Sequence, residues 1–364
     1  MIQFADIYNN KKVLVTGHTG FKGSWLCLWL KNMGAHVTGY ALEPETEPNH
    51  YNLLNLGISS VIGDIRNFKK VKNLFETVKP EIVFHLAAQP LVQRSYRDPR
   101  ETYETNIMGA VNVYEAARQC DSVRAIVCVT SDKVYENREW LWGYRENDPV
   151  GGYDPYSSSK GCTEIITSSY RNSFFNQKQS SRKNSLLLAS ARAGNVIGGG
   201  DWAEDRLVPD IMRATAKSET VIIRNPVSTR PWQHVLEPLS GYLLIGQKLL
   251  EEQSSFAEAW NLGPLEEGAI TVEKVVRRIK KNWDRVDYVL SERMRSSHEA
   301  NYLKIDCSKA HIKLKWFPVW DSEKTFAATT EWYREFYTQS SLLSEKHLDS
   351  YIETAKEAQA CWVT

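Results

Sequence analysis

The chain has 364 residues, of which 42% are hydrophobic and 24% charged, so it can bury a large core and form about two domains or one domain with an elaborated second lobe. A formal net charge of +1 excludes a general electrostatic attraction to nucleic acid or to an anionic membrane, so neither is expected as a partner. Six cysteines without a CxxC pair predict reduced thiols, and eight histidines without zinc-ligand spacing predict no metal site.

The chain begins without the pattern of a targeting signal. Residues 1–6 contain no basic segment that leads into an apolar one. No stretch approaches the run of about 18 apolar residues that spans a membrane. We therefore expect a cytoplasmic protein.

An apolar strand expected at 13–16 leads directly into three glycines, Gly17, Gly20 and Gly23, and then into a helix. In a dinucleotide-binding loop the first glycine allows the tight turn, the second lets backbone N–H groups approach a pyrophosphate, and the third lets the helix pack closely. The partial positive charge of the helix N-terminus then faces the phosphates. The spacing is GxxGxxG instead of the commoner GxGxxG, and glycines also serve ordinary turns, so the order of strand, glycines and helix carries this prediction.

Strand and helix patterns alternate through the first half of the chain. The expected strands are 13–16, 36–41, 60–62, 82–86, 123–130 and 186–191, and the expected helices end at 33 or span 67–78, 99–119 and 155–174. This order predicts an α/β fold with a doubly wound parallel sheet of the Rossmann type.

After Gly194 the pattern loosens into a Gly-rich loop, short helices and short strands. This change predicts a smaller, mostly C-terminal α/β lobe that binds the substrate. We expect a nucleotide-binding domain at 1–193, to which later segments return, a substrate lobe at 194–340, and a helical tail of unknown role at 341–364.

The choice of cofactor depends on the end of the second strand. Glu43 lies 20 residues after Gly23, the usual distance to an acidic residue that meets the ribose hydroxyls, although it could equally be a solvated loop residue. No arginine follows the strand at 36–41, and an NADP 2′-phosphate would require one, so NAD is expected. Asp64, after the third strand, could contact the adenine edge or help to begin the next helix.

Tyr156 and Lys160 lie four residues apart, so on a helix both project from one face. Tyr8 and Lys12 share this spacing before the first strand, which shows that the spacing alone is weak evidence. The position of Tyr156 and Lys160 after the fifth strand favours this pair as a catalytic base and its activating cation. A tyrosine base near neutrality needs a pKa drop of about 3 units, or about 4 kcal/mol, and one cation about 5 Å away supplies about 3 kcal/mol at an effective dielectric constant of about 20. Lys160 and a positive nicotinamide ring together could therefore suffice.

Three polar residues follow the fifth strand at the edge of the sheet where ligands of such folds bind. Ser131, Asp132 and Lys133 supply a hydroxyl, a carboxyl and an amine in succession. Although they could form an ordinary polar turn, the set is richer than a redox reaction alone requires, which favours additional acid/base chemistry.

Several motifs together resemble the extended short-chain dehydrogenase/reductase family. They are Thr-Gly-His-Thr-Gly-Phe-Lys-Gly, Gly63-Asp-Ile-Arg, His85-Leu-Ala-Ala, the Thr-Ser-Asp-Lys-Val-Tyr loop, Tyr156 with Lys160, and Arg192-Ala-Gly-Asn195-Val. The resemblance extends to about residue 340. Within the family the sequence is most similar to the nucleotide-sugar 4,6-dehydratases, and among these to the branch that acts on CDP-glucose.

The resemblance implies catalytic roles. Tyr156 and Lys160 match the family's base and its activating lysine, and Ser131 matches the hydroxyl that assists the tyrosine. Asp132 matches the acid that protonates the departing 6-hydroxyl. Lys133 stands where most 4,6-dehydratases carry the glutamate that removes the C5 proton, so the C5 base stays open: the lysine can serve only if its surroundings keep it neutral.

The resemblance also implies binding residues and a homodimer formed by the helices at 99–119 and 155–174. NAD is expected at Gly17, His18, Thr19, Gly20, Phe21, Lys22, Gly23, Asp64, Ile65, Leu86, Ala87, Ala88, Tyr156 and Lys160. The nucleotide sugar is expected at Asn195, Arg206, Leu207, Arg230 and Tyr302. The loop after the fourth strand, with Gln89 and Arg94, is expected to line the same cleft, although it could equally be a solvated connection.

The sequence thus predicts a lyase that dehydrates a nucleoside-diphosphate glucose with bound NAD. A nucleotide-sugar 4-epimerase needs only the redox half of this chemistry, and the Ser131–Asp132–Lys133 set argues against it. A non-catalytic NAD-binding sensor would not require Tyr156 and Lys160, so the presence of both residues argues against a sensor.

Overall fold

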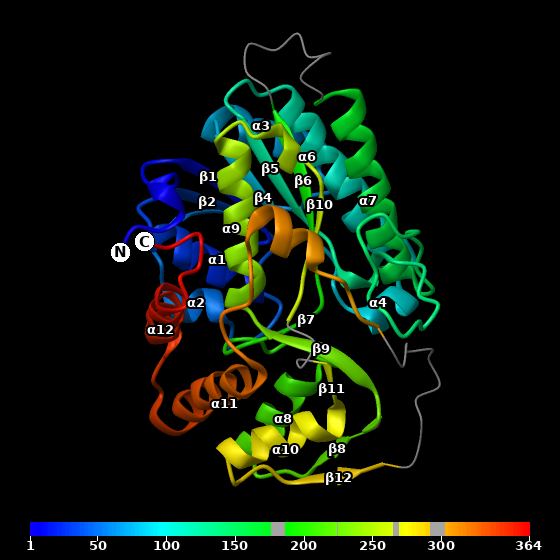
Figure 1. Ribbon diagram of the computed structural model, residues 1–364, viewed down its shortest axis with the longest axis vertical. Coiled ribbons are helices and arrows are strands. Elements are labelled where there is room, and N and C mark those ends of the chain that lie inside the picture. The colour runs from blue at the N-terminus through cyan, green and yellow to red at the C-terminus, as the bar shows by residue number, and fades with distance from the viewer. Residues whose placement is uncertain (176–185, 224, 265–268, 292–302) are drawn as a thin grey trace.

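The centre of the protein is a seven-stranded sheet, in which every pairing is parallel (Figure 1). The computed structural model describes residues 1–175, 186–223, 225–264, 269–291 and 303–364. The strand order is β10-β6-β5-β4-β1-β2-β3. The strands are β1 (Lys12–Thr16), β2 (His36–Ala41), β3 (Ser59–Ile62), β4 (Ile82–His85), β5 (Ala125–Val129), β6 (Leu187–Ala193) and β10 (Ala259–Leu262). The predicted doubly wound α/β fold is confirmed.

Helices cover both faces of this sheet. Successive residues of β1 belong to different cores, Val13 and Val15 to one and Leu14 to the other, because side chains alternate along a strand. Helices α1 (Phe21–Asn32) and α9 (Leu236–Leu250) cover the first face, and α3 (Phe68–Val78), α6 (Gly109–Arg118) and α7 (Pro155–Ser173) cover the second. Burial on both faces explains why β1, β4 and β5 read as nearly continuous apolar runs, whereas the edge strand β3 is exposed.

The helix expected at 99–119 is interrupted. It consists of α5 (Pro99–Tyr103), a π-helical turn at Glu104–Met108, and α6. Asn106, on the π-helical turn, is buried and donates to Gln89 O at 3.1 Å and to Ser159 Oγ at 2.8 Å. The turn therefore fixes the loop after β4 against α7.

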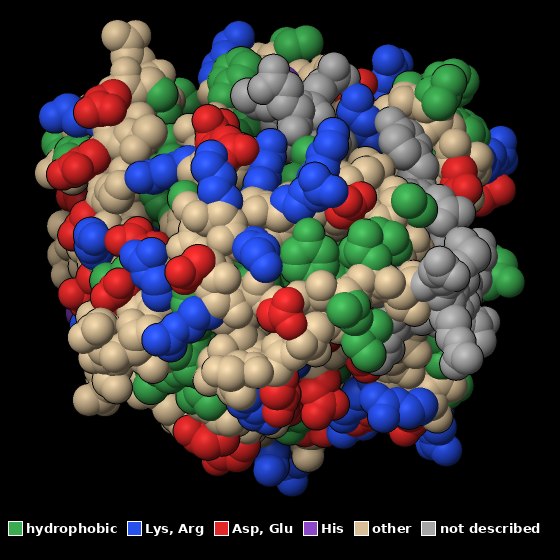
Figure 2. Space-filling model, turned by 90° about the horizontal axis from the view of Figure 1, so that it is seen from below, with side chains coloured by type: hydrophobic (Ala, Val, Ile, Leu, Met, Phe, Trp, Pro, Cys, Tyr) green, Lys and Arg blue, Asp and Glu red, His purple; other side chains and the backbone are tan. Residues whose placement is uncertain are grey.

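A smaller lobe lies below the carboxyl edge of the sheet in Figure 1. Within the described ranges it contains a three-stranded sheet, a two-stranded sheet and three helices. Its strands are β7 (Asn195–Ile197), β8 (Val221–Ile223), β9 (Thr229–His234), β11 (Ala269–Thr271) and β12 (Tyr288–Leu290), and its helices are α8 (Leu207–Ala216), α10 (Val272–Asn282) and α11 (Ser322–Gln339). Seen from below, its surface carries charged side chains of both signs side by side (Figure 2). Both α9 and β10 return from this half of the chain to the central sheet, while the boundaries 1–193 and 194–340 stay a prediction.

The C-terminal segment is held tightly to the nucleotide-binding half. Helix α12 (Ser344–Glu357) places the Tyr351 hydroxyl where it donates to Glu237 Oε2 of α9 at 2.7 Å. At the chain ends, Thr364 N donates to Ile2 O at 2.9 Å, and the rings of Phe4 and Trp362 stack at 5.1 Å. The expected helical tail is thus part of the fold. No helix in the described ranges is long and apolar enough to cross a membrane.

A buried ion pair joins α7 to β6 beneath the carboxyl edge of the sheet. Arg192 Nη2 lies 2.8 Å from Glu164 Oε2, and both side chains are 4% exposed. Glu164 also accepts from Thr130 Oγ1 at 2.5 Å and from Ser190 Oγ at 2.8 Å. Burial alone would raise the pKa of Glu164, but Arg192 and these donors hold it below its usual value.

We predict that Glu164→Gln destabilises the protein by about 3–5 kcal/mol, because it leaves the Arg192 charge buried and unpaired. Urea unfolding at constant pH would measure the loss. Glu115→Gln is the matched control, since Glu115 pairs with a more exposed partner, Arg118, and should cost about 1 kcal/mol or less. Equal losses in the two variants would contradict the importance of the buried pair.

Candidate active site

A large cavity of about 1440 Å³ lies between the carboxyl edge of the sheet and the smaller lobe. Its lining includes the glycine loop, the ends of β2 to β5, the start of α7, and residues of α8, β8 and β9. This volume exceeds the range of about 300–1,000 Å³ that is usual for one drug-sized ligand. The cavity therefore has room for two ligands.

The glycine loop can have this conformation only with glycine at two of its positions. Gly17 has φ +78°, and a methyl group on it would lie 2.7 Å from Ala87 N. A methyl group on Gly23 would lie 2.1 Å from Gly17 O. Gly20, which directly precedes α1, has more space, since its methyl group would lie 3.4 Å from Gly17 O. This arrangement fits the expected division of roles in a dinucleotide loop.

The other residues of the loop point in different directions. Thr19, Phe21 and Lys22 line the cavity. His18 does not contribute to this lining: its side chain is buried with Nε2 2.7 Å from Ser60 Oγ, and burial lowers its pKa to about 4. As a cofactor contact, His18 can therefore offer its backbone. Burial and the nearby charges of Arg206 and Lys160 lower the pKa of Lys22 to about 8.

The predicted adenosine end of the cavity is lined by Glu43, Asp64 and Ile65. The Asp64 carboxylate forms an ion pair with Arg66 at 2.6 Å. Asn67, and not Asp64, caps α3 by accepting from Lys70 N at 3.1 Å. Asp64 is therefore not the cap of α3, although its Oδ1 accepts from Arg66 N at 2.8 Å in the turn before the helix. Its contact with the adenine edge stays a prediction. Leu86, Ala87 and Ala88, directly after β4, also line the cavity.

Tyr156 lies in the first turn of α7, which begins at Pro155 and is capped by Asp154. Burial raises the pKa of Tyr156 to about 12, whereas the Ser131 hydroxyl and Arg206 lower it. Lys160 Nζ donates to Val129 O at 3.3 Å. Ser131 and Arg206, rather than Lys160, are the protein groups that lower the pKa of Tyr156 most, and the catalytic pairing of Tyr156 with Lys160 stays a prediction.

Asp132 is a buried carboxyl group at the centre of the site. Its Oδ1 accepts from Ser131 Oγ at 3.0 Å, and its buried Oδ2 has no hydrogen-bond partner among the described residues. Burial raises the pKa of Asp132, while Lys133, Ser131 and Arg230 oppose this effect. A carboxyl group in this setting can hold a proton and donate it from Oδ2.

The predicted substrate residues fall into two groups. Asn195, Arg206, Leu207 and Arg230 line the cavity. Arg206 donates to Asp201 Oδ2 at 2.7 Å, and Arg230 is buried on β9, close enough to Asp132 to affect its pKa. Tyr302 lies outside the described residues.

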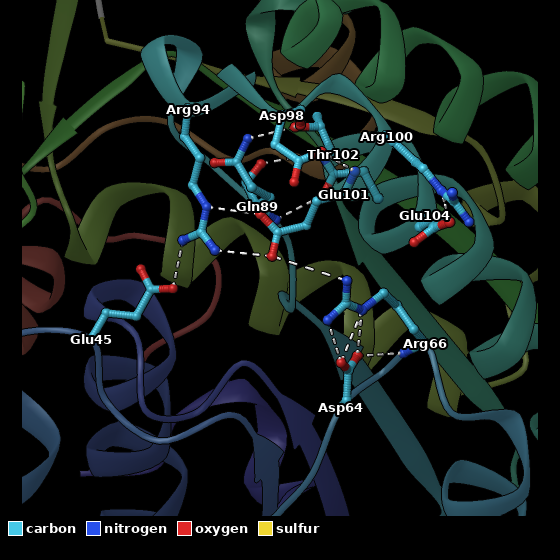
Figure 3. A network of polar contacts seen from close by, with 11 residues as sticks. Glu45, Asp64, Arg66, Gln89, Arg94, Asp98, Arg100, Glu101, Thr102 and Glu104 are labelled. Atoms are coloured by element: carbon cyan, nitrogen blue, oxygen red, sulfur yellow. Dashed lines mark hydrogen bonds and ion pairs between the residues drawn. The ribbon is translucent and has the colours of Figure 1, made fainter. Parts of the chain in front are cut away.

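Gln89 and Arg94 also line the cavity, but their side chains bind the protein itself. Gln89 donates to Leu91 O at 3.1 Å and to Thr102 Oγ1 at 2.9 Å. Arg94 lies on α4 (Val92–Arg97), a short helix where the sequence suggested a loop, and forms ion pairs with two glutamates (Figure 3). As substrate contacts both residues stay predictions.

Other charged residues that the sequence did not indicate also line the cavity, among them Glu45, Arg66 and Glu101. Arg66 is the last residue of the Gly63-Asp-Ile-Arg motif. Because this motif directly follows a strand, the sequence could have indicated Arg66 as a residue of the site. Glu45 and Glu101 lie in polar segments with many similar residues, and only their partners in space distinguish them.

The chain was compared with known proteins. Residues 14–329 match the family described as GDP-mannose 4,6 dehydratase. A CDP-glucose 4,6-dehydratase from Salmonella typhimurium is 51% identical over 351 residues, which cover 95% of this chain and 98% of the relative. A dTDP-glucose 4,6-dehydratase from Haemophilus influenzae is 24% identical, over 88% of this chain and 97% of the relative.

Solved structures show the same architecture. UDP-glucose 4-epimerase from Thermotoga maritima, in a structure with UDP-glucose, has a TM-score of 0.76 at 22% identity and covers 89% of this chain and 98% of its own. UDP-glucose 4-epimerase from Thermus thermophilus, in a complex with NAD, has a TM-score of 0.72 at 22% identity, with 88% and 98% covered. At these identities the structural matches establish the fold alone.

We predict that alanine at Gly20 and at Gly23 has different consequences. Gly20→Ala should leave the unfolding free energy of the ligand-free protein nearly unchanged, yet weaken dinucleotide binding by about tenfold or more, because its methyl group blocks the close approach of a pyrophosphate. Gly23→Ala should lower the unfolding free energy by about 1–3 kcal/mol, because its methyl group overlaps Gly17 O.

Urea unfolding and isothermal titration with NAD would measure the two effects. If Gly20→Ala binds NAD as tightly as the parent protein does, the pyrophosphate does not bind at this loop.

Proposed function

Because the chain belongs to the family of GDP-mannose 4,6-dehydratases, we propose that it is a hydro-lyase that converts CDP-glucose to CDP-4-dehydro-6-deoxy-glucose and water. One observation of the site supports dehydration above all. In the cavity that Tyr156 also lines, Asp132 presents a buried carboxyl oxygen that has no hydrogen-bond partner in the part of the chain that the structure describes. A reaction that only oxidises and reduces C4 has no use for a second acid. The name of the 51% identical relative supports CDP-glucose as the substrate.

We propose NAD as the cofactor. The close approach of Gly17 and Gly23 and the open space at Gly20 fit a pyrophosphate at the N-terminus of α1. Thr19, Phe21, Lys22, Ile65 and Ala87 would be among the residues that hold it. When bound there, NAD would supply the redox chemistry, taking a hydride from C4 of the sugar and returning one to C6.

In this proposal the first proton transfer belongs to Tyr156. Its Oη would accept the proton of the 4-hydroxyl as C4 is oxidised, and Ser131, which already lowers the tyrosine pKa, would share that proton. The positive ring of the bound cofactor would add the favourable charge that the protein alone does not supply. Lys160, which donates to Val129 O, would bind the cofactor ribose from the same helix.

Elimination would require one acid and one base. A ketone at C4 makes the C5 hydrogen acidic, and loss of that proton expels the 6-hydroxyl. Asp132 would give its proton from Oδ2 to this departing oxygen, which leaves as water. Lys133, which lines the same cavity, is the candidate for the C5 base.

The lobe side of the cavity would hold the nucleoside diphosphate. Arg206 and Arg230 would donate to the phosphate oxygens, since guanidinium groups match them in charge and geometry. Asn195 and Leu207 line this side as well. Because these residues follow position 193, we propose that residues 1–193 form the nucleotide-binding lobe and residues 194–340 the substrate lobe.

We also propose a homodimer in the cytoplasm. Met108, Ile165 and Phe174 are 50%, 58% and 45% exposed, on or beside the helices at 99–119 and 155–174. Apolar side chains in such positions suit a helical interface. All six cysteines are free, which suits a reducing compartment.

Isotopic labelling tests the proposed function. With CDP-glucose deuterated at C4, in ordinary water, we predict a 4-keto-6-deoxy product that is one water lighter, carries deuterium at C6 and forms without net NADH. NMR and mass spectrometry would read both label and mass. Deuterium retained at C4 with no loss of water would indicate an epimerase, and unchanged substrate would indicate a sensor.

A second prediction concerns Lys133. If it removes the C5 proton, Lys133→Met should still oxidise C4, seen as absorbance of reduced nicotinamide, while exchange of the C5 hydrogen with heavy water falls by at least about a hundredfold. Lys69→Met, an exposed lysine outside the cavity lining, is the control. Undiminished C5 exchange would assign the base to another residue.

A further inference from the structure

Two arginines that do not belong to the connection after β2 line the cavity. No arginine follows β2 directly, and this absence favoured NAD over NADP. Arg66, which follows β3, and Arg94, on α4, nevertheless line the cavity together with Glu43. Selectivity against a 2′-phosphate therefore needs a different explanation, because guanidinium groups are good phosphate ligands.

Both arginines form ion pairs with carboxylate groups (Figure 3). Arg94 donates from Nη1 to Glu45 Oε1 at 2.8 Å, and from Nε and Nη2 to the two Glu101 oxygens at 2.9 and 3.0 Å. Arg66 donates from Nη2 to Asp64 Oδ2 at 2.6 Å, and its Nη1 lies 4.0 Å from Glu101 Oε1. All five residues line the cavity.

The charges of this network sum to −1, from two guanidinium groups and three carboxylates. Glu43, which lines the same cavity two residues before Glu45, adds a further negative charge. The guanidinium group of Arg94 already donates hydrogen bonds to two glutamates, and these glutamates also raise the pKa of Arg94. A doubly negative phosphate placed here would meet net negative charge and occupied donors, whereas a ribose hydroxyl could hydrogen-bond to a carboxylate.

We propose that Glu45 is a specificity-determining residue, which makes the cavity select NAD over NADP by occupying Arg94. The inference rests on the proposed binding of a nicotinamide dinucleotide. Glu45 belongs to the loop that follows β2, the same loop that carries Glu43, and its ion pair joins this loop to α4. Loss of the Glu45 charge would release Nη1 of Arg94 toward the cavity while Glu101 still orients the guanidinium group.

Isothermal titration of NAD and NADP, after removal of any co-purified nucleotide, tests this proposal. Parent protein should bind NAD more tightly than NADP. Glu45→Gln should bind NADP about tenfold or more tightly than the parent does, with NAD affinity changed by less than about threefold. The double variant Glu45→Gln/Arg94→Gln should lose this gain, because the gain depends on the freed arginine.

Glu104→Gln is the matched control. Glu104 also pairs with an arginine, Arg100, at 2.7 Å on the same helical segment, but neither residue lines the cavity. This variant should bind both dinucleotides like the parent.

An unchanged ratio of NADP to NAD affinity in Glu45→Gln, or a gain that persists in the double variant, would overturn the inference and leave the proposed function standing. A parent protein that binds neither dinucleotide would overturn both.

Discussion

The site depends on the close approach of two backbone segments at the start of α1. Gly17 turns the chain off β1, and Gly23 packs against the Gly17 carbonyl with no space for a side chain. This contact brings the first turn of α1 down onto the sheet beside Ala87, at the end of β4. The N-terminus of α1 then opens into the same cavity as Tyr156 and Asp132, whose positions α7 and the end of β5 determine.

The features that the sequence predicted correctly are those that depend on local residue patterns. Strand and helix positions followed from apolar periodicity, and the cavity formed where the carboxyl ends of parallel strands must meet. Asp154 and Asn67 cap helices through contacts within three residues, so such starts are visible in sequence. The π-helical turn at Glu104–Met108 was not visible, and within it Asn106 bonds to Gln89 and Ser159, which are distant in the chain.

Side-chain partners were the part that sequence could not determine. Arg94 was expected to bind substrate, yet its partner Glu45 lies 49 residues away, on another connection of the sheet. His18 follows the first glycine and turns away to Ser60, and Lys160 donates to a backbone carbonyl. In each case tertiary packing supplies a partner within the protein that the sequence did not indicate, and the predicted ligand contact stays a prediction.

Burial changes the acid/base properties of the central residues in opposite directions. It raises the pKa of Tyr156 and Asp132 and lowers that of Lys22 and Lys160, because a low-dielectric site disfavours every charged form. An acid that keeps its proton is what elimination of a hydroxyl requires, so burial suits Asp132 to its proposed role. The same burial opposes ionisation of Tyr156. The two functions can coexist only if charge arrives with the ligands: a positive nicotinamide ring would favour the tyrosinate while Asp132 remains in its pocket. Chemistry at this site would therefore begin only when the cavity is filled.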